Sequence, residues 1–132
     1  FDSHTLPPLN FASLLRRSAT KAERLRLIGV IMMYCTYILR SLKTPGAIYI
    51  GHTSDLKSRV SRHNSPNNNG YSKRHAPWVV ETYIAFSDEE DAKTFELYLK
   101  SSSGKAFMKK RLISSEFEEA LEKFNNGRNN ER

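Results

Sequence analysis

Three runs of the chain are rich in β-branched and aromatic residues, a composition typical of β-strands. They are YCTYILR at residues 34–40, AIYIG at residues 47–51 and WVVETYIAF at residues 78–86. A short turn containing Pro45 and Gly46 separates the first two runs. The pattern therefore predicts a β-hairpin and a third strand further along the chain.

Apolar residues at helical spacing follow the second and third predicted strands. The first predicted helix ends at about His63, with Thr53 or Ser54 as its cap and Asp55 in its first turn. The second covers residues 87–102, where Ser87 and Glu90 suggest a capping box. Both helices begin directly after a strand, so both are expected to pack against the sheet.

The rest of the chain gives weaker signals. Residues 103–111 predict one more helix, and residues 114–124 predict a last amphipathic helix with an apolar stripe of Phe117, Leu121 and Phe124. Residues 64–77 are rich in Asn, Pro and Gly and are expected to form an irregular loop. The last eight residues are expected to fray, and a helix within residues 10–31 has no predicted place in the fold.

The order of these elements predicts an α+β fold, a small three-stranded antiparallel sheet flanked by helices. A chain of 132 residues suits one such domain. We expect an N-terminal extension at residues 1–33 that could form a helix, a main domain at residues 34–112, and a C-terminal helix with its tail at residues 113–132. Met32 or Met33, just before the first strand, is a candidate alternative start.

The net charge indicates what kind of partner the protein binds. The chain carries a formal net charge of +7, and residues 34–112 hold thirteen basic against seven acidic side chains. Such a balance favours a polyanion. Nucleic acid is the first candidate, an anionic membrane surface is the second, and a basic surface without a ligand is the simplest alternative. A single cysteine, Cys35, excludes an internal disulfide and a cysteine zinc cluster and is expected to be buried.

Apolar runs are too short to span a bilayer, and the basic and apolar residues before the first strand lack a small-residue cleavage site. We therefore expect a cytoplasmic protein with no membrane partner.

Two basic side chains lie on or beside the apolar face of the first predicted helix, where a packed core would require apolar side chains. Leu56 and Val60 mark its apolar face. His63 falls within roughly 20° of Leu56 and Arg59 within roughly 60°, whereas Arg62 points away. A functional pocket would explain this placement, although an ordinary helix histidine remains possible for His63.

The second helix has the same anomaly with a carboxylate. Ala92, Phe95 and Leu99 define its core stripe, and Glu96 lies roughly 40° from Ala92. A carboxylate there must be paired, hydrogen-bonded or bound to a metal. A purely structural ion pair between Glu96 and Arg59 is an equally good explanation.

Two tyrosines lie in the predicted hairpin. Tyr37 shares its strand face with Cys35 and Leu39, while Tyr49 has the small neighbours Ala47 and Gly51. Small neighbours would leave the Tyr49 ring accessible, and Gly51 would let a backbone or a phosphate approach closely.

Together these residues resemble a known family. The pattern TYIL, IYIGHTSDLKSRVSRHN and FELYLK, spread over residues 34–112, is similar to the GIY-YIG nuclease superfamily, above all its short stand-alone bacterial members. These members resemble in turn the incising domain of the bacterial nucleotide-excision nuclease. The resemblance implies the same three-stranded antiparallel sheet with flanking helices.

The resemblance also implies roles. Tyr37 and Tyr49 correspond to the two motif tyrosines, Arg59 to the arginine that contacts the scissile phosphate, His63 to a Tyr-or-His position, and Glu96 to the acidic metal ligand. His52 stands where several members have lysine. In the first motif this chain has TY where the family has IY, and the glycine of that motif is absent. Met108 stands where some members carry an asparagine.

These roles suit phosphodiester hydrolysis. One carboxylate, Glu96, can hold one Mg²⁺ or Mn²⁺ if waters and substrate oxygens complete the shell, and Arg59 can clamp a phosphate with its planar fork. An ordinary tyrosine pKa near 10 is far from neutral, whereas histidine needs no shift. Two assignments stay open: Tyr37 or Tyr49 takes the proton from water with an imidazole assisting, or His63 takes it and the tyrosines orient the water.

The sequence thus predicts a metal-dependent DNA endonuclease without a small-molecule cofactor. A DNA-binding module that retains the fold without cleaving is the main alternative, and a basic protein-interaction domain is the weakest. DNA repair is one pathway that the resemblance suggests, beside mobility and defence. The candidate DNA-binding side chains are Lys57, Arg62, Tyr71, Lys73, Arg74, Lys100, Lys105, Lys109 and Lys110.

Overall fold

A three-stranded antiparallel sheet forms the centre of the computed structural model, which describes residues 20–24 and 33–130. The strands are β1 (Tyr34–Ser41), β2 (Ile48–Thr53) and β3 (Trp78–Phe86), in the order β2-β1-β3. Strand β1 is therefore central and pairs on both sides, while β2 and β3 are the two edges. The predicted hairpin, third strand and fold class are confirmed.

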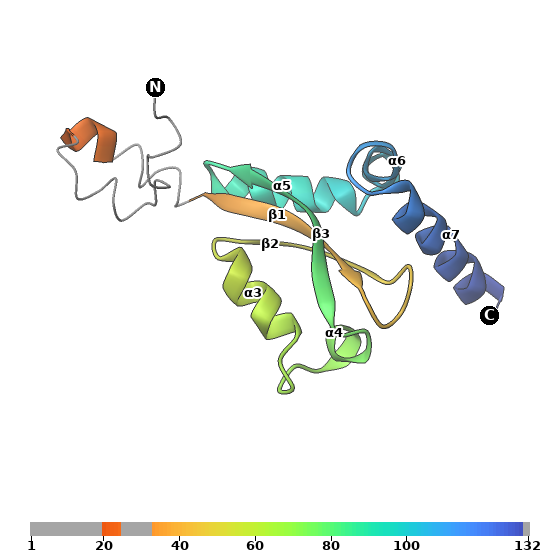
Figure 1. Cartoon of the computed structure of the whole chain (residues 1–132). Helices are drawn as coiled ribbons and strands as arrows, with labels where there is room; N and C mark the ends of the chain where they lie inside the picture. The colour runs from red at the N-terminus through yellow and green to blue at the C-terminus, as the bar shows by residue number, and fades with distance from the viewer. Residues whose placement is uncertain (1–19, 25–32, 131–132) are drawn as a thin grey trace, which may run out of the picture.

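Helices cover both faces of this sheet (Figure 1). Helices α3 (Leu56–His63) and α4 (Gly70–Arg74) lie on one face, and α5 (Glu89–Leu99) and α6 (Ser102–Arg111) lie on the other. Helix α7 (Ser115–Asn130) runs away from α6 toward the C-terminus. None of the helices in residues 20–24 and 33–130 is long and apolar enough to cross a membrane.

Alternation along β1 divides the core into two clusters. Ile38 faces α5 and α6 and packs with Leu99 and Met108, while Tyr37 and Leu39 face α3 and pack with Trp78. Each cluster sits between the sheet and one helical layer. As a result, one strand supplies neighbouring side chains to opposite faces of the molecule.

Helices α3 and α5 are capped one or two residues later than predicted. Asp55, and not Thr53 or Ser54, caps α3 by accepting a hydrogen bond from the Ser58 amide. Asp88 caps α5 by accepting from the Glu90 amide, so the predicted Ser87 box is wrong. Several residues with good capping side chains stand next to each other at both places, and backbone direction selects among them.

The segment predicted to be an irregular loop contains a short helix, α4. Gly70 begins it with a positive φ of 65°. Tertiary contacts hold it: the Trp78 indole donates to the Ser72 carbonyl, and the Tyr71 hydroxyl donates to the Ile48 carbonyl. The expectation of irregular structure is therefore wrong for these five residues.

Helix α7 is longer than predicted, because it continues to Asn130 instead of ending at residue 124. Phe117 and Leu121 are buried against Ile38, Leu99 and Met108, and Phe124 packs against the other cluster. The expected apolar stripe is confirmed, whereas most of the tail expected to fray is helical.

At the other end of the chain, residues 21–24 form one helical turn, in which Thr20 and Glu23 exchange hydrogen bonds. The rest of the predicted N-terminal helix lies outside the described residues. The division into three segments remains a prediction.

Candidate active site

A chain of hydrogen bonds behind β2 links three polar side chains from three elements. The Tyr37 hydroxyl on β1 lies 3.1 Å from His63 Nε2 on α3, and His63 Nδ1 lies 3.0 Å from Ser72 Oγ on α4. Tyr37, His63 and Ser72 are all buried. Because the Tyr37 hydroxyl and Ser72 occupy both ring nitrogens, the imidazole is fixed in place.

Burial determines the protonation states of Tyr37 and His63. It raises the pKa of Tyr37 to about 12, with Tyr49 and Glu96 adding to the rise and the nearby Arg59 guanidinium opposing it. Burial also lowers the pKa of His63, and the positive charges of Arg59 and Arg62 lower it further. The phenol of Tyr37 and the imidazole of His63 are therefore both neutral at pH 7.

Gly51 makes the position of the Tyr37 phenol possible. The two residues lie directly opposite each other in the β1–β2 ladder. A Cβ atom at residue 51 would lie only 2.6 Å from the Tyr37 hydroxyl oxygen. Glycine was expected to admit a backbone or a phosphate here, but the group that approaches it is the phenol of Tyr37.

Tyr49 is the more accessible of the two tyrosines. Its ring stacks on that of Tyr37 at 6.2 Å between centroids and lies 4.3 Å from the His63 ring centroid. Tyr37 is fully buried, whereas Tyr49 is half-buried on the edge strand β2. A substrate can therefore reach Tyr49, with Tyr37 and His63 behind it.

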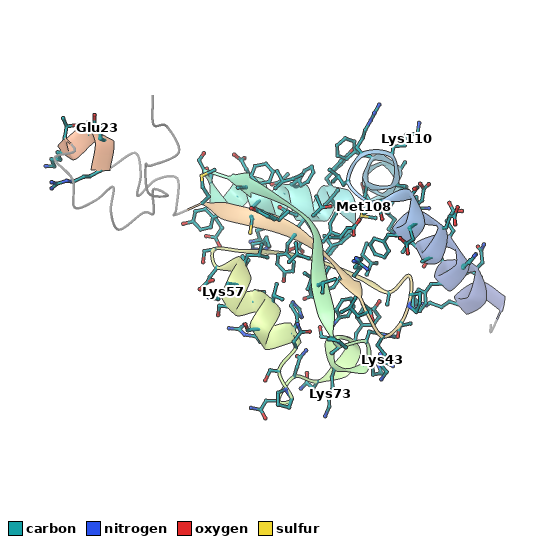
Figure 2. The ribbon with its side chains drawn as sticks, in the orientation of Figure 1. Glu23, Lys43, Lys57, Lys73, Met108 and Lys110 are labelled. Carbon is teal, nitrogen blue, oxygen red and sulfur yellow. The ribbon has the colours of Figure 1, made fainter. Side chains whose placement is uncertain are left out.

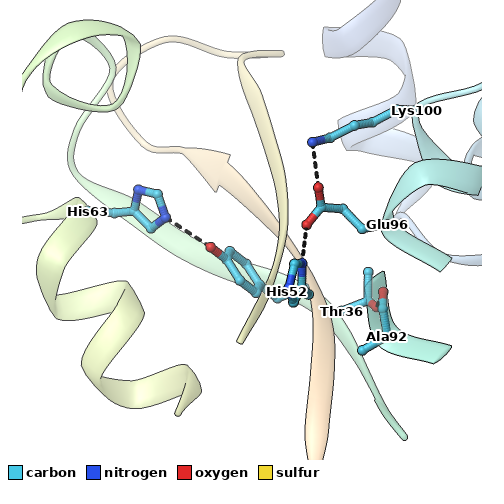
Figure 3. Close-up of polar contacts among 7 residues, drawn as sticks. Thr36, His52, His63, Ala92, Glu96 and Lys100 are labelled. Atoms are coloured by element: carbon cyan, nitrogen blue, oxygen red, sulfur yellow. Dashed lines mark hydrogen bonds and ion pairs between the residues drawn. The ribbon is translucent and has the colours of Figure 1, made fainter. Parts of the chain in front are cut away.

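Glu96 lies on the opposite face of the sheet, where two basic groups hold its carboxylate (Figure 3). His52 Nδ1 is 2.7 Å from Glu96 Oε1, and Lys100 Nζ donates to Glu96 Oε2 at 2.7 Å. The structural ion pair considered between Glu96 and Arg59 is thus wrong, since Glu96 pairs with His52 and Lys100. Helical i,i+4 spacing explains the Lys100 contact, and alternation along β2 brings His52 to this face.

These contacts keep Glu96 ionised. Burial would raise its pKa, but the hydrogen bonds from Lys100 and His52 outweigh burial and hold the pKa below the ordinary value for Glu. An ionised carboxylate is a ligand that Mg²⁺ and Mn²⁺ accept. No group of three or more His, Cys, Asp or Glu side chains that could hold a metal gathers within residues 20–24 and 33–130. Glu96 fits a site in which waters and substrate oxygens supply the other ligands.

The two halves of the site meet at the edge strand β2. Arg59 and Glu96 act on the Tyr37 phenol from opposite sides of the sheet, the first lowering its pKa and the second raising it. Tyr49, His52, Arg59 and Glu96 are all half-buried, while Tyr37 and His63 lie behind them. The structure therefore places the six predicted catalytic residues on both faces of the β1–β2 pair, with Tyr37, Tyr49, Arg59 and His63 on the α3 face and His52 and Glu96 on the α5 face.

The predicted DNA-binding residues fall into separate groups (Figure 2). Lys57 lies on α3 and Lys73 on α4, on one side of the sheet, while Lys110 lies on α6 on the other. Tyr71 is half-buried, and its hydroxyl binds the Ile48 carbonyl. Lys100 is engaged by Glu96, and Lys109 lies 3.8 Å from Glu122. The remaining members, Arg62, Arg74 and Lys105, are exposed.

Sequence reasoning missed Ser72 and the Lys100–Glu96 pair as parts of the site. Ser72 stands in a segment predicted to be irregular, so nothing in the local pattern placed it near His63. The spacing of Glu96 and Lys100 was a usable signal, because Glu four residues before Lys on a helix favours a side-chain pair.

The amino-acid sequence is similar to those of known proteins. A family model described as the GIY-YIG catalytic domain matches residues 33–111, so the chain belongs to the GIY-YIG family. The predicted resemblance is confirmed, and the short bacterial type is represented among its relatives.

Two kinds of relative are similar to the chain. The UPF0213 protein YsiG of Lactococcus lactis is 34% identical over 94 residues, covering 67% of this chain and 88% of that protein. The structure-specific endonuclease subunit slx1 of Talaromyces marneffei is 37% identical over 68 residues, covering 48% of this chain but only 18% of that protein. The corresponding Schizosaccharomyces pombe subunit is 38% identical over 68 residues, and the matched part covers 25% of its length. The chain thus spans a small part of the fungal subunits and most of the bacterial protein.

Proposed function

We propose that this protein is a DNA endonuclease that hydrolyses phosphodiester bonds with the help of one divalent cation. The observation that carries the proposal is the grouping of Tyr49, His52, Arg59 and Glu96 at the edge of β2, with the Tyr37–His63–Ser72 chain behind them. Membership of the GIY-YIG family and the likeness to fungal endonuclease subunits support it.

Glu96 is the residue that would hold Mg²⁺ or Mn²⁺. Such an ion supplies Lewis-acid stabilisation of the charge that builds on the phosphate. The Lys100 side chain is half-exposed. Its ammonium group can therefore leave the Glu96 carboxylate and move into solvent. His52 would then remain as the group that orients Glu96.

Arg59 suits the role of a phosphate clamp. Its guanidinium is permanently charged and forms parallel hydrogen bonds to phosphate oxygens. It lies on the Tyr49 face of the sheet, near the Tyr37 phenol whose pKa it lowers. A phosphodiester bound at the β2 edge would therefore face Arg59 from one side and Glu96 from the other.

Tyr49 is our candidate for the group that accepts the proton from the attacking water. Tyr37 is fully buried, and with a pKa of about 12 its phenolate would cost about 7 kcal/mol at pH 7. His63 has the right protonation state, but the Tyr37 hydroxyl and Ser72 occupy both of its ring nitrogens. Tyr37 and His63 would instead hold the Tyr49 ring in position.

A binding module without cleavage is the second candidate function. It is favoured by one observation: both carboxylate oxygens of Glu96 are bound by His52 and Lys100. If that network never opens, Glu96 cannot ligate a metal and the domain would only bind DNA.

The test is plasmid cleavage with Mg²⁺ or Mn²⁺ by the wild type, Glu96→Gln and the matched control Glu122→Gln. We expect cleavage by the wild type and Glu122→Gln, and a loss of at least a hundredfold in Glu96→Gln, because electrostatic groups at a reacting phosphate contribute about that much or more. Equal cleavage by all three would remove Glu96 as metal ligand. A folded wild type that binds DNA but cleaves neither plasmid nor branched nor nicked DNA would establish the binding-module alternative.

A further inference from the structure

A small cavity lies at the outer edge of β2, between that strand and helices α6 and α7. Its volume is about 260 Å³. Ile48 and Ile50 form its floor from β2, Met108 and Leu121 come from α6 and α7, and the side chain of Tyr71 lines it from α4. The interior is therefore apolar and in part aromatic.

The rim of this cavity is basic. Lys105, Lys109, Asn125 and Arg128 complete the lining. Lys109 shares its charge with Glu122 at 3.8 Å, an exposed and long ion pair. The described lining thus carries three positive charges and an amide around an apolar interior, which is complementary to a flat organic group attached to an anion.

The cavity lies next to the candidate active site along β2. Side chains two residues apart on a strand share a face, so Ile48, Ile50 and His52 lie in one row along β2. His52 binds Glu96, and Ile50 is about 7 Å further along the strand at 3.3 Å per residue. A strand of nucleic acid whose phosphate is at Glu96 would therefore pass the mouth of the cavity if it runs along β2 toward Ile48.

We propose that this cavity binds one unpaired nucleotide of a DNA strand next to the phosphate that is cleaved. The base enters between Tyr71 and the apolar floor, and the cations Lys105, Lys109 and Arg128 bind its phosphate. The volume is below the range of about 300–1,000 Å³ for drug-sized ligands, which suits one base and is too small to enclose a base pair. The substrate must therefore have a single-stranded segment at this place.

Part of this subsite lies outside the matched family domain. Leu121, Asn125 and Arg128 belong to α7, which follows the matched residues 33–111. The C-terminal helix thus adds a specificity element to the GIY-YIG domain. This inference rests on the proposed function and adds the class of substrate.

The test measures DNA binding by fluorescence anisotropy in the presence of EDTA, so that no strand is cut. Three probes are compared: a blunt duplex, the same duplex with a single-stranded overhang, and that overhang with abasic nucleotides. The wild type is expected to prefer the normal overhang about tenfold over both others, since stacking of one base contributes on that scale. Lys105→Ala/Arg128→Ala is expected to lose the preference, and so is Asn125→Glu, a single exposed position that leaves the core intact.

The matched control is Lys93→Ala/Lys123→Ala, which removes the same charge from exposed positions outside the cavity. It is expected to weaken binding to all probes alike and to keep the preference. Equal binding of normal and abasic overhangs by the wild type would overturn the subsite, as would unchanged preference in both cavity variants. If the wild type cleaves plasmid in those cases, the subsite alone fails. Absence of both DNA binding and cleavage would remove the proposed function as well.

Discussion

At the scale of single residues, the two tyrosines of the site differ in what surrounds them. Tyr37 is on the central strand, fully buried, and hydrogen-bonded to His63, while Tyr49 is on an edge strand and half-buried. We therefore propose different chemical roles for the two phenols, because access and charge decide which of them can meet water.

Replacing each tyrosine with phenylalanine tests this difference. Tyr49→Phe is expected to lower the cleavage rate by about 10²–10⁴, the usual contribution of general acid–base catalysis. Tyr37→Phe is expected to cost less than about tenfold, because it removes one hydrogen bond to His63 and leaves the ring stack in place. Single-turnover cleavage measures both, and a larger loss in Tyr37→Phe would reverse our assignment.

The pH dependence of cleavage tests the role of His63. Burial lowers its pKa below the ordinary value for histidine, so the imidazole is neutral at pH 7 and becomes protonated only in more acidic solution. We expect wild-type activity to fall on that acid side and Tyr37, with a pKa of about 12, to cause no change near neutrality.

The matched variants are His63→Gln and His63→Ala. Glutamine cannot titrate but can hydrogen-bond to Tyr37 and Ser72, so it should remove the acid limb that belongs to His63 and keep most of the activity. Alanine should lower the activity at every pH. A wild-type acid limb that persists unchanged in both variants would show that it belongs to another group.

At the scale of elements, the contact between β1 and β2 at Gly51 is the tightest part of the site. Gly51→Ala would place a methyl group 2.6 Å from the hydroxyl of Tyr37, which is fully buried. We expect a loss of about 1–3 kcal/mol in the free energy of unfolding and reduced activity.

Gly127→Ala is the control, since a Cβ there meets nothing within 4 Å and helix α7 favours alanine by up to about 1 kcal/mol. Urea unfolding measures both variants. If Gly51→Ala were as stable and as active as the wild type, the phenol would have more room than the structure gives it.

The strands and most helices follow from the sequence because their periodicity is local. The burial of Ala92 and Leu99 was predictable for that reason, as was the placement of His63 on the apolar side of α3. Helix α4 was missed because five residues carry little periodic signal and contacts with Trp78 and Ile48 hold it. Caps were misplaced where adjacent polar residues were equally suitable.

The candidate site shows the same limit. The six predicted catalytic positions came from a motif resemblance, and the fold places them on the two faces of the β1–β2 pair. The partners of Glu96 depend on which face of β2 meets α5, which the single-sequence pattern left open. The sequence therefore identified Glu96 as a candidate, but only the tertiary structure showed that its carboxylate pairs with His52 and Lys100.

At the scale of the whole molecule, the folded unit extends beyond the end of the matched family domain. The family match stops at residue 111, but Phe117 and Leu121 of α7 are 5% and 4% exposed and complete the cluster around Ile38. Burial of such side chains stabilises a protein by about 1.5–3 kcal/mol each, a large part of a typical 5–15 kcal/mol.

A chain ending at Leu112 is therefore expected to lose most of its stability. One ending at Phe124 keeps the core and loses only Asn125 and Arg128 from the rim of the cavity, where Lys105 and Lys109 remain. Thermal unfolding followed by circular dichroism compares the two. A fully stable chain ending at Leu112 would show that α7 is not part of the folding unit.

The free edge of β2 has one more consequence. Edge strands invite pairing with another chain, and here the Tyr71 hydroxyl already occupies the Ile48 carbonyl. Under the proposed function, the rest of the edge must stay open, because a substrate would reach Tyr49 and Glu96 around it. A second molecule that added a strand to β2 would cover this passage. Self-association along this edge would therefore inhibit the proposed nuclease activity, so the same backbone must both resist pairing and leave room for DNA.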